Sequence, residues 1–166
     1  MSTTNLYDEN AKKKIKGIAE DVDFCMMATN LTVQPLSVIP MSTKEVDSDG
    51  AIWFLSNKDS DHNADIISDP TTQLLYSGTS EMKFLSVYGT SEIIHDRDTI
   101  AKLYSSADNA WFDGKDDPNI TAIKFKPSEA AYWSNDGNKL VTLFKLAKAA
   151  VTGENQDIGT SGKLSV

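Results

Sequence analysis

The sequence contains little of what most catalytic and metal-binding motifs require. It has one cysteine, Cys25, and two histidines, His62 and His95. One cysteine cannot form an internal disulfide or a thiolate-rich metal site, so nothing here requires an oxidising compartment. The patterns G-x-G-x-x-G, G-x-x-x-x-G-K-[ST], H-E-x-x-H and C-x-x-C are absent. Dinucleotide-binding, Walker-type, zincin and thioredoxin-like functions therefore have no support from motifs.

Positive charge and long apolar runs are also scarce. Lys and Arg total 16 against 24 Asp and Glu, which gives a formal net charge of −8. Such a chain is poorly suited to bind nucleic acid or an anionic membrane surface. The longest apolar run near the N-terminus, Phe24–Ala28, is far shorter than the roughly 20 residues that span a bilayer. We expect no nucleic-acid partner, no membrane partner and a cytoplasmic location.

What is present is typical of a globular domain. The chain has 166 residues, of which 40% are hydrophobic and 24% charged, a composition that can fill one core. We expect one folded domain over residues 1–152. The end of the chain, residues 153–166, is polar and contains glycine, so we expect it to form a flexible tail.

The apolar patterns predict a mainly β protein with a few helices. Expected helices are Asn5–Asp21, Asp61–Ser68, Asp98–Ser105 and Leu140–Val151. Expected strands are Phe24–Thr29, Leu36–Met41, Ala51–Leu55, Thr72–Tyr76, Met82–Ile94 and Ile120–Trp133. We expect irregularities at Gly89 and at Pro127. Strands that follow one another this closely favour an antiparallel barrel or sandwich.

Two charged segments have structural interpretations. The lysines within residues 12–16 are better explained by a solvated helix face than by a nucleic-acid arm, given the acidic total. Residues 45–50 are similar to the start of a calcium loop, but Ser56 stands where that loop needs a bidentate Glu. The Asp49-Gly50 pair instead indicates a hairpin that would make Leu36–Met41 and Ala51–Leu55 antiparallel neighbours.

Cys25 and His95 are isolated reactive side chains. Cys25 lies in an apolar run, where a free cysteine more often packs as a small hydrophobe than acts as a nucleophile. His95 stands beside Asp96 and Arg97 at a strand end, a position typical of a surface residue. We therefore predict no metal site, and no side chain stands out as a catalytic acid or base.

The segment 56–63 ends a strand and begins a helix. Such a turn directs N–H groups and the positive end of a helix dipole to one spot, which suits a phosphate. Ser56 and Ser60 would add hydroxyl donors, and His62 a switchable positive charge. The alternative is an ordinary helix start, because the two aspartates of the segment favour helix N-termini and repel anions. These residues alone leave both interpretations open, and the ordinary helix start is the commoner of the two.

Three stretches carry a family resemblance: residues 39–62 (IPMSTKEVDSDGAIWFLSNKDSDH), residues 111–118 (WFDGKDDP) and residues 129–133 (EAAYW). Together they resemble the pyridoxamine-phosphate-oxidase-like FMN-binding split barrels, and most closely their bacterial general stress protein branch. The resemblance covers about residues 10–135. It implies an α+β split barrel of about six antiparallel strands with Greek-key connections and flanking helices. It also implies a homodimer with an FMN site at each end of the interface.

The resemblance further implies which residues bind FMN. One strand borders the flavin, the next contacts flavin and phosphate, a helix start holds the phosphate, and an aromatic residue lies near the flavin. In that order, the matching residues are Ile39, Pro40, Met41, Ser42, Thr43 and Lys44; Leu55 and Ser56; Ser60 and His62; and Trp133.

Two departures from the family pattern remove fixed positive charges. Ile39 stands where the family has the arginine of its R-P-M run, and His62 where it usually has a phosphate-binding lysine. The resemblance therefore implies weak, pH-dependent FMN binding. Lys44 is the cationic candidate left in this strand for the N1 edge of a reduced flavin. Its alternative role is that of a solvent-facing lysine beside Glu45.

These observations lead to one functional hypothesis and its alternatives. We expect a cytoplasmic, dimeric FMN-binding protein that acts as a flavin-dependent oxidoreductase on an unassigned substrate. A dimer would also cover Trp111, Phe112 and Trp133, which a single barrel would expose. Lys139–Val141 stands where true pyridoxamine phosphate oxidases have R-x-H, which argues against vitamin B6 oxidation. The alternatives are a non-catalytic flavin-binding or flavin-buffering protein and, more distantly, haem handling on the same barrel.

Overall fold

The computed structural model describes residues 2–80, 82–135 and 159–166 of the chain. The helices in these ranges are α1 (Asp8–Val22), α2 (Asp61–Ser68), α3 (Arg97–Leu103) and the 3-10 helix η1 (Ser106–Ala110). The strands are β1 (Ser2–Thr3), β2 (Leu6–Tyr7), β3 (Phe24–Thr29), β4 (Ser37–Ser42), β5 (Glu45–Val46), β6 (Ile52–Asn57), β7 (Thr71–Gly78), β8 (Lys83–Ile94), β9 (Ile120–Ser134) and β10 (Thr160–Ser165).

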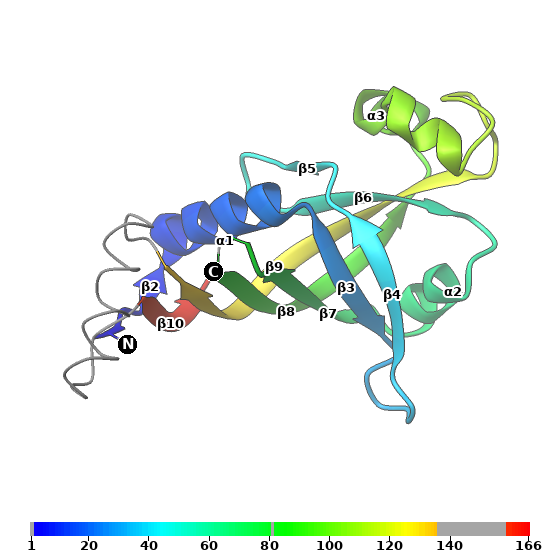
Figure 1. The fold of residues 1–166 in the computed structure, drawn as a ribbon. Coiled ribbons are helices and arrows are strands. Elements are labelled where there is room, and N and C mark those ends of the chain that lie inside the picture. The colour runs from blue at the N-terminus through cyan, green and yellow to red at the C-terminus, as the bar shows by residue number, and fades with distance from the viewer. Residues whose placement is uncertain (1, 81, 136–158) are drawn as a thin grey trace.

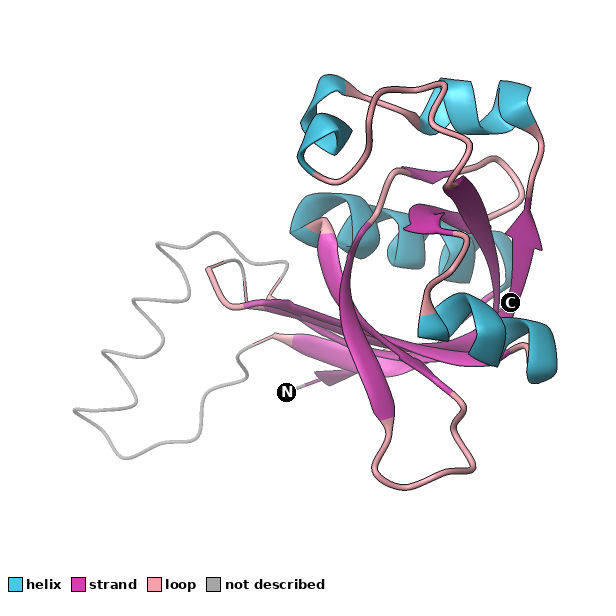
Figure 2. Ribbon diagram, turned by 90° about the vertical axis from the view of Figure 1, so that its right-hand side faces the viewer, coloured by secondary structure: helices cyan, strands magenta, loops and turns pink. Residues whose placement is uncertain are grey.

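The longer strands form a split barrel (Figures 1 and 2). Antiparallel pairing runs in the order β4, β3, β7, β8, β9 and β6. The sheet does not close, since no ladder joins its end strands β4 and β6 among the described residues. The prediction of a mainly β split barrel with about six antiparallel strands is therefore confirmed. The short strands β1 and β2 add parallel pairs at the edge of β10, so the whole sheet is mixed.

Alternating apolar side chains fill the barrel. Phe54 and Phe125 are fully buried, and Ile15 and Ile18 of α1 pack into the same cluster. Burying each such side chain contributes roughly 1.5–3 kcal/mol. A second, smaller cluster lies between α3 and the strands β6 and β9; its buried members are Ile100, Leu103, Ile120 and Ala122. The smaller cluster anchors the segment between β8 and β9 beside the candidate site.

The irregularities expected at Gly89 and Pro127 are confirmed as one feature. The β8–β9 register pairs Tyr88 with Glu129 and then Gly89 with Pro127, so Ser128 is the extra residue of a bulge. A Cβ on Gly89 would lie 2.1 Å from the backbone oxygen of Lys126. Glycine is needed here because the two backbones approach more closely than any side chain allows.

The hairpin expected between Leu36–Met41 and Ala51–Leu55 does not form. The turn around Gly50, whose φ is 87°, joins the two-residue strand β5 to β6, while β4 pairs with β3. The predicted pairing of those two segments is therefore wrong. Residues 43 and 44 separate β4 from β5, so the turn joins only β5 to β6. Asp47 stabilises the turn by accepting hydrogen bonds from the backbone N–H groups of Asp49 and Ala51.

The expectation of a flexible tail is wrong for residues 160–165. They form β10, which pairs antiparallel with the end of β9 and parallel with β1 and β2. Leu164 is 1% exposed and belongs to the main core. Residues 153–158 and the expected helix Leu140–Val151 lie outside the described residues. Within the described ranges, no helix has the length and apolar character needed to cross a membrane.

Candidate functional site

Ser56 lies in a buried polar network beneath the start of α2. It is 4% exposed, and its hydroxyl donates to Asn63 Oδ1 at 2.8 Å and lies 2.8 Å from Thr121 Oγ1. The Asn63 side-chain amide also donates to Thr121 Oγ1 at 2.8 Å. Because every member has a partner, the network fixes α2 against β6 and β9. Ser56 thus positions the helix start, with its hydroxyl engaged inside the protein.

Ser60 and His62 form the outer part of the same helix start. The Ser60 hydroxyl accepts from the backbone N–H of Asn63 and lies 3.1 Å from His62 Nε2. Desolvation lowers the pKa of His62 below its ordinary 6.5, although Asp61 and Asp65 act to raise it. The first N–H groups of an α-helix have no acceptor within the helix. An anion here would meet backbone donors, the helix dipole and a histidine whose protonation it favours.

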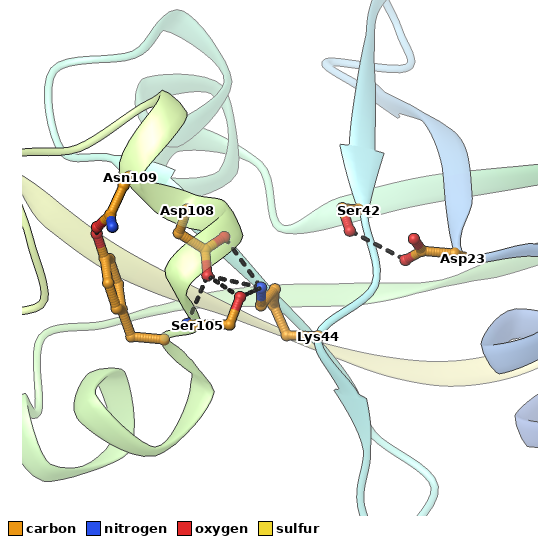
Figure 3. A network of polar contacts seen from close by, with 7 residues as sticks. Asp23, Ser42, Lys44, Ser105, Asp108 and Asn109 are labelled. Carbon is orange, nitrogen blue, oxygen red and sulfur yellow. Dashed lines mark hydrogen bonds and ion pairs between the residues drawn. The ribbon is translucent and has the colours of Figure 1, made fainter.

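The strand β4 presents its candidate residues to two opposite faces. Met41 is buried and Ile39 partly buried, both against the main core. Pro40 is exposed on the other face. Ser42 donates a hydrogen bond from its hydroxyl to Asp23 Oδ1 at 3.0 Å (Figure 3). The strand therefore offers a ligand mainly its backbone and the exposed proline.

Thr43 and Lys44, just after β4, are both engaged inside the protein. Thr43 Oγ1 lies 2.9 Å from the hydroxyl of buried Tyr76. Lys44 Nζ donates to both carboxylate oxygens of Asp108, at 2.9 and 2.8 Å, and to Ser105 Oγ at 3.3 Å (Figure 3). The Lys44 and Asp108 side chains are only 13% and 12% exposed. The interpretation of Lys44 as a solvent-facing lysine is therefore wrong.

Asp108 is the residue near the site that sequence reasoning missed. Burial acts to raise the pKa of its carboxyl, but hydrogen bonds from Lys44 and Ser105 outweigh it, and the pKa lies below its ordinary value. The Asp108 carboxylate also accepts from the backbone N–H of Ser105 at 2.7 Å. No sequence motif marks Asp108, because its partner Lys44 lies in a distant part of the sequence.

Trp133 lies far from the phosphate candidates within one chain. Ser56 pairs with Thr121 across the β6–β9 ladder, and Trp133 lies twelve residues further along β9. At about 3.3 Å per residue, the two positions are about 40 Å apart along the strand. The other candidate on β6, Leu55, is partly buried against the smaller cluster with Phe112. The structure thus joins Lys44 to β6 through the hydrogen bond from its backbone N–H to the Trp53 oxygen, joins Ser56 to α2 through Asn63, and leaves Trp133 away from these residues.

Trp133 instead belongs to an exposed apolar surface, which we call the outer sheet face. The register places its members on the same side of the sheet, because Met26 pairs with Leu75 and Trp133 with Phe84. Each is between 40% and 61% exposed. The outer sheet face comprises Phe24, Met26, Val38, Leu75, Tyr88 and Trp133. A surface of this kind is typical of a protein interface.

The model of the family described as "Pyridoxamine 5'-phosphate oxidase like" matches residues 10–157. The chain belongs to this family. The family resemblance found from residues 39–62, 111–118 and 129–133 is therefore confirmed.

Two curated relatives of this pyridoxamine 5'-phosphate oxidase-like protein share part of their length with it. The protein bli-3 of Neurospora crassa is 25% identical over 123 residues, which cover 69% of this chain and 59% of that protein. General stress protein 26 of Bacillus subtilis is 28% identical over 81 residues, which cover 47% of this chain and 58% of that protein. The matches thus span less than two thirds of either relative.

Solved structures of general stress proteins share the fold. A general stress protein 26 from Jannaschia sp. CCS1 is 28% identical, with a TM-score of 0.81, over 96% of this chain and 100% of that one. The general stress FMN/FAD binding protein of Xanthomonas citri is 23% identical, with a TM-score of 0.64, over 77% and 90% of the two chains. At that identity the second likeness shows the fold alone.

Proposed function

We propose that this protein binds FMN, with the phosphate at the start of α2, and acts as a flavin-dependent oxidoreductase. The observation that carries the proposal is the pairing of Ser60 and His62 at the first turn of α2, the helix that follows β6. Family membership adds support, since the related Xanthomonas citri protein is called an FMN/FAD binding protein.

The residues at the α2 start fit a phosphate group. The Ser60 hydroxyl, the first-turn N–H groups and a protonated His62 are suitable donors for phosphate oxygens. Asp59 and Asp61 oppose an anion in the same turn, and Ile39 and His62 replace the family's fixed cations. Binding should therefore depend on the charge of His62.

In the bound state the flavin would supply the electron transfer, and the protein would hold and orient it. Ser60 and His62 would hold the phosphate, while β4 and Leu55 would border the ring system. Ser56 keeps the helix start in place through Asn63 and Thr121. Vitamin B6 is not the substrate we propose. This rests on Lys139–Val141 in place of R-x-H, and these three residues lie outside the described residues.

We further propose that the working form is a homodimer. Trp133 and the α2 start are too far apart in one chain to contact the same mononucleotide. A second copy placed against the outer sheet face would bring its own Trp133 toward the first copy's site. It would also cover the exposed apolar side chains. We place this dimer in the cytoplasm, in keeping with the acidic charge and the single, buried Cys25.

One observation favours the alternative of a flavin-binding protein without catalysis. Lys44, the cation expected beside the flavin N1 edge, is held by Asp108. Turnover of a reduced nicotinamide by the flavin-loaded protein separates the two functions. An oxidoreductase consumes the nicotinamide catalytically, whereas a flavin-binding module retains FMN without turnover.

Binding of FMN should weaken as pH rises through a range that begins below 6.5, the ordinary pKa of histidine. The pKa of free His62 is lowered by desolvation, and a bound phosphate would raise it, so binding takes up a proton and is favoured at lower pH. Riboflavin lacks the phosphate and should bind more weakly, with little pH dependence. Titration of both flavins across this range measures the difference.

Lysine substitution tests the same site. His62→Lys restores a fixed cation and should tighten FMN binding about tenfold at pH 8, remove the pH dependence and leave riboflavin unchanged. His95→Lys is the matched control, because His95 is exposed just after β8, and it should change neither flavin's affinity. Equal affinity of the unmutated protein for FMN and riboflavin at every pH would contradict a phosphate site here.

A further inference from the structure

The segment 105–119, which connects α3 to β9, contacts a candidate from each of two groups, Lys44 after β4 and Leu55 on β6, and also contacts the turn that precedes α2. Lys44 forms its ion pair with Asp108, and Leu55 packs in the smaller cluster with Phe112. The turn before α2 donates a hydrogen bond from the Lys58 backbone N–H to the oxygen of Asn119 at 2.8 Å. The segment therefore lies against the elements that carry the β4 and β6 candidates and against the turn that leads to the α2 start.

The segment 105–119 is held firmly at both ends. At its start, Ser105 and Asp108 form a capping box, and Asp108 also binds Lys44 (Figure 3). Near its end, the carboxylate of Asp117 accepts from the backbone N–H groups of Asp113 and Asn119. The guanidinium of Arg97 donates to two backbone oxygens here, those of Lys115 at 2.8 Å and Asp117 at 3.3 Å, and to that of Ile120 at the start of β9. A segment with these contacts presents its exposed side chains in fixed positions.

Trp111 lies within this segment and is 82% exposed. The adjacent Phe112 is partly buried in the smaller cluster. Phe112 therefore already attaches the segment to the domain through apolar contacts. Holding a large aromatic ring in water forgoes the stabilisation that its burial would give. The contrast between a fixed backbone and an exposed indole is typical of a residue that contacts a ligand or a partner.

We propose that Trp111 contacts the isoalloxazine ring of the bound flavin, and that the Lys44–Asp108 ion pair positions it. This inference rests on the proposed FMN site and adds a specificity-determining residue to it. An indole suits this role because it stacks on flat aromatic ligands, whichever group those ligands carry at their far end. Lys44 and Asp108 act through the position of the segment and need no contact with the flavin.

Replacing Trp111 by alanine tests the contact. Trp111→Ala should weaken FMN and riboflavin alike, by about three- to tenfold, because both ligands share the ring. It should also increase the fluorescence of the bound flavin, since a stacked indole quenches flavin emission. Trp111→Phe retains an aromatic face and should recover most of the affinity. The side chain is exposed, so these variants should keep the thermal stability of the unmutated protein.

Asp108→Asn tests the positioning role. It should raise bound-flavin fluorescence in the same direction as Trp111→Ala, whereas Asp21→Asn should not. Asp21 is the control, because it forms a more exposed ion pair with Lys83 away from the segment.

Each other outcome has a definite meaning. Unchanged affinity and fluorescence in Trp111→Ala, while the unmutated protein binds FMN, would overturn this inference and leave the proposed function standing. A monomeric Trp111→Ala protein would assign Trp111 to the subunit interface and also overturn it. An unmutated protein that binds neither flavin would overturn the proposed function and this inference together.

Discussion

Leu75→Lys is expected to give a folded monomer that has lost at least about a hundredfold in FMN affinity. Leu75 is 44% exposed and lies on the outer sheet face, paired with Met26 of β3. In a two-fold dimer the substitution would place a charge in an apolar interface twice, once in each copy, at a cost of several kcal/mol. Separating the subunits would also remove the partner's Trp133 from the site. Light scattering and FMN titration of the same sample measure the two effects.

Ile67→Lys provides the matched control for this prediction. Ile67 is a more exposed aliphatic residue, at 73%, and lies in the last turn of α2 rather than on the sheet. This variant should remain dimeric and bind FMN normally. A Leu75→Lys protein that stays dimeric, or a monomer that binds FMN with the affinity of the unmutated protein, would contradict the proposed interface.

Lys44→Met should lower the free energy of unfolding by about 2–3 kcal/mol. The substitution leaves the carboxylate of Asp108 without its cation at a position only 12% exposed, and an unpaired buried charge is strongly destabilising. The remaining exposure and the hydrogen bonds from Ser105 reduce the loss below that of a fully buried pair. Chemical denaturation at neutral pH measures it.

A second substitution separates the ion pair from other effects of losing the lysine. In Lys44→Met/Asp108→Leu no unpaired charge remains, so part of the lost stability should return. The pKa of Asp108 is lowered in the folded protein, so the pair's contribution is complete above the ordinary carboxyl pKa of 3.8 and decreases as pH falls below it. A Lys44→Met protein as stable as the unmutated one at pH 7 would show that the ion pair is unimportant.

The parts of the fold that depend on local sequence could be predicted. Ser60 caps α2 and the Asp-Gly pair makes a turn, because each acts on its immediate neighbours. The strand β10 could not be found, since TSGKLS has one large apolar residue and becomes a strand only by pairing with distant β9. The strand β4 was predicted, but the Asp49-Gly50 turn was taken to pair it with Ala51–Leu55, whereas it pairs with the preceding strand β3.

The candidate site shows the same division. The helix start around Ser60 and His62 was visible in the sequence because its residues are consecutive. The role of Lys44 was not, because its partner Asp108 lies 64 residues away. The family resemblance placed Trp133 among the flavin residues but could not show that it lies on the outer sheet face of the same chain. The separation follows from the β6–β9 register and the length of β9, and the β8–β9 register puts Trp133 on that face.

The central claim is that a dimer of this chain binds FMN with residues from both copies. Sedimentation of the protein with added FMN, followed by flavin absorbance, tests it most directly. We predict that flavin absorbance sediments with a dimer at one FMN per subunit, and that Leu75→Lys leaves the flavin free. Flavin that remains unbound in the unmutated protein, or that sediments stoichiometrically with a monomer, would contradict the account.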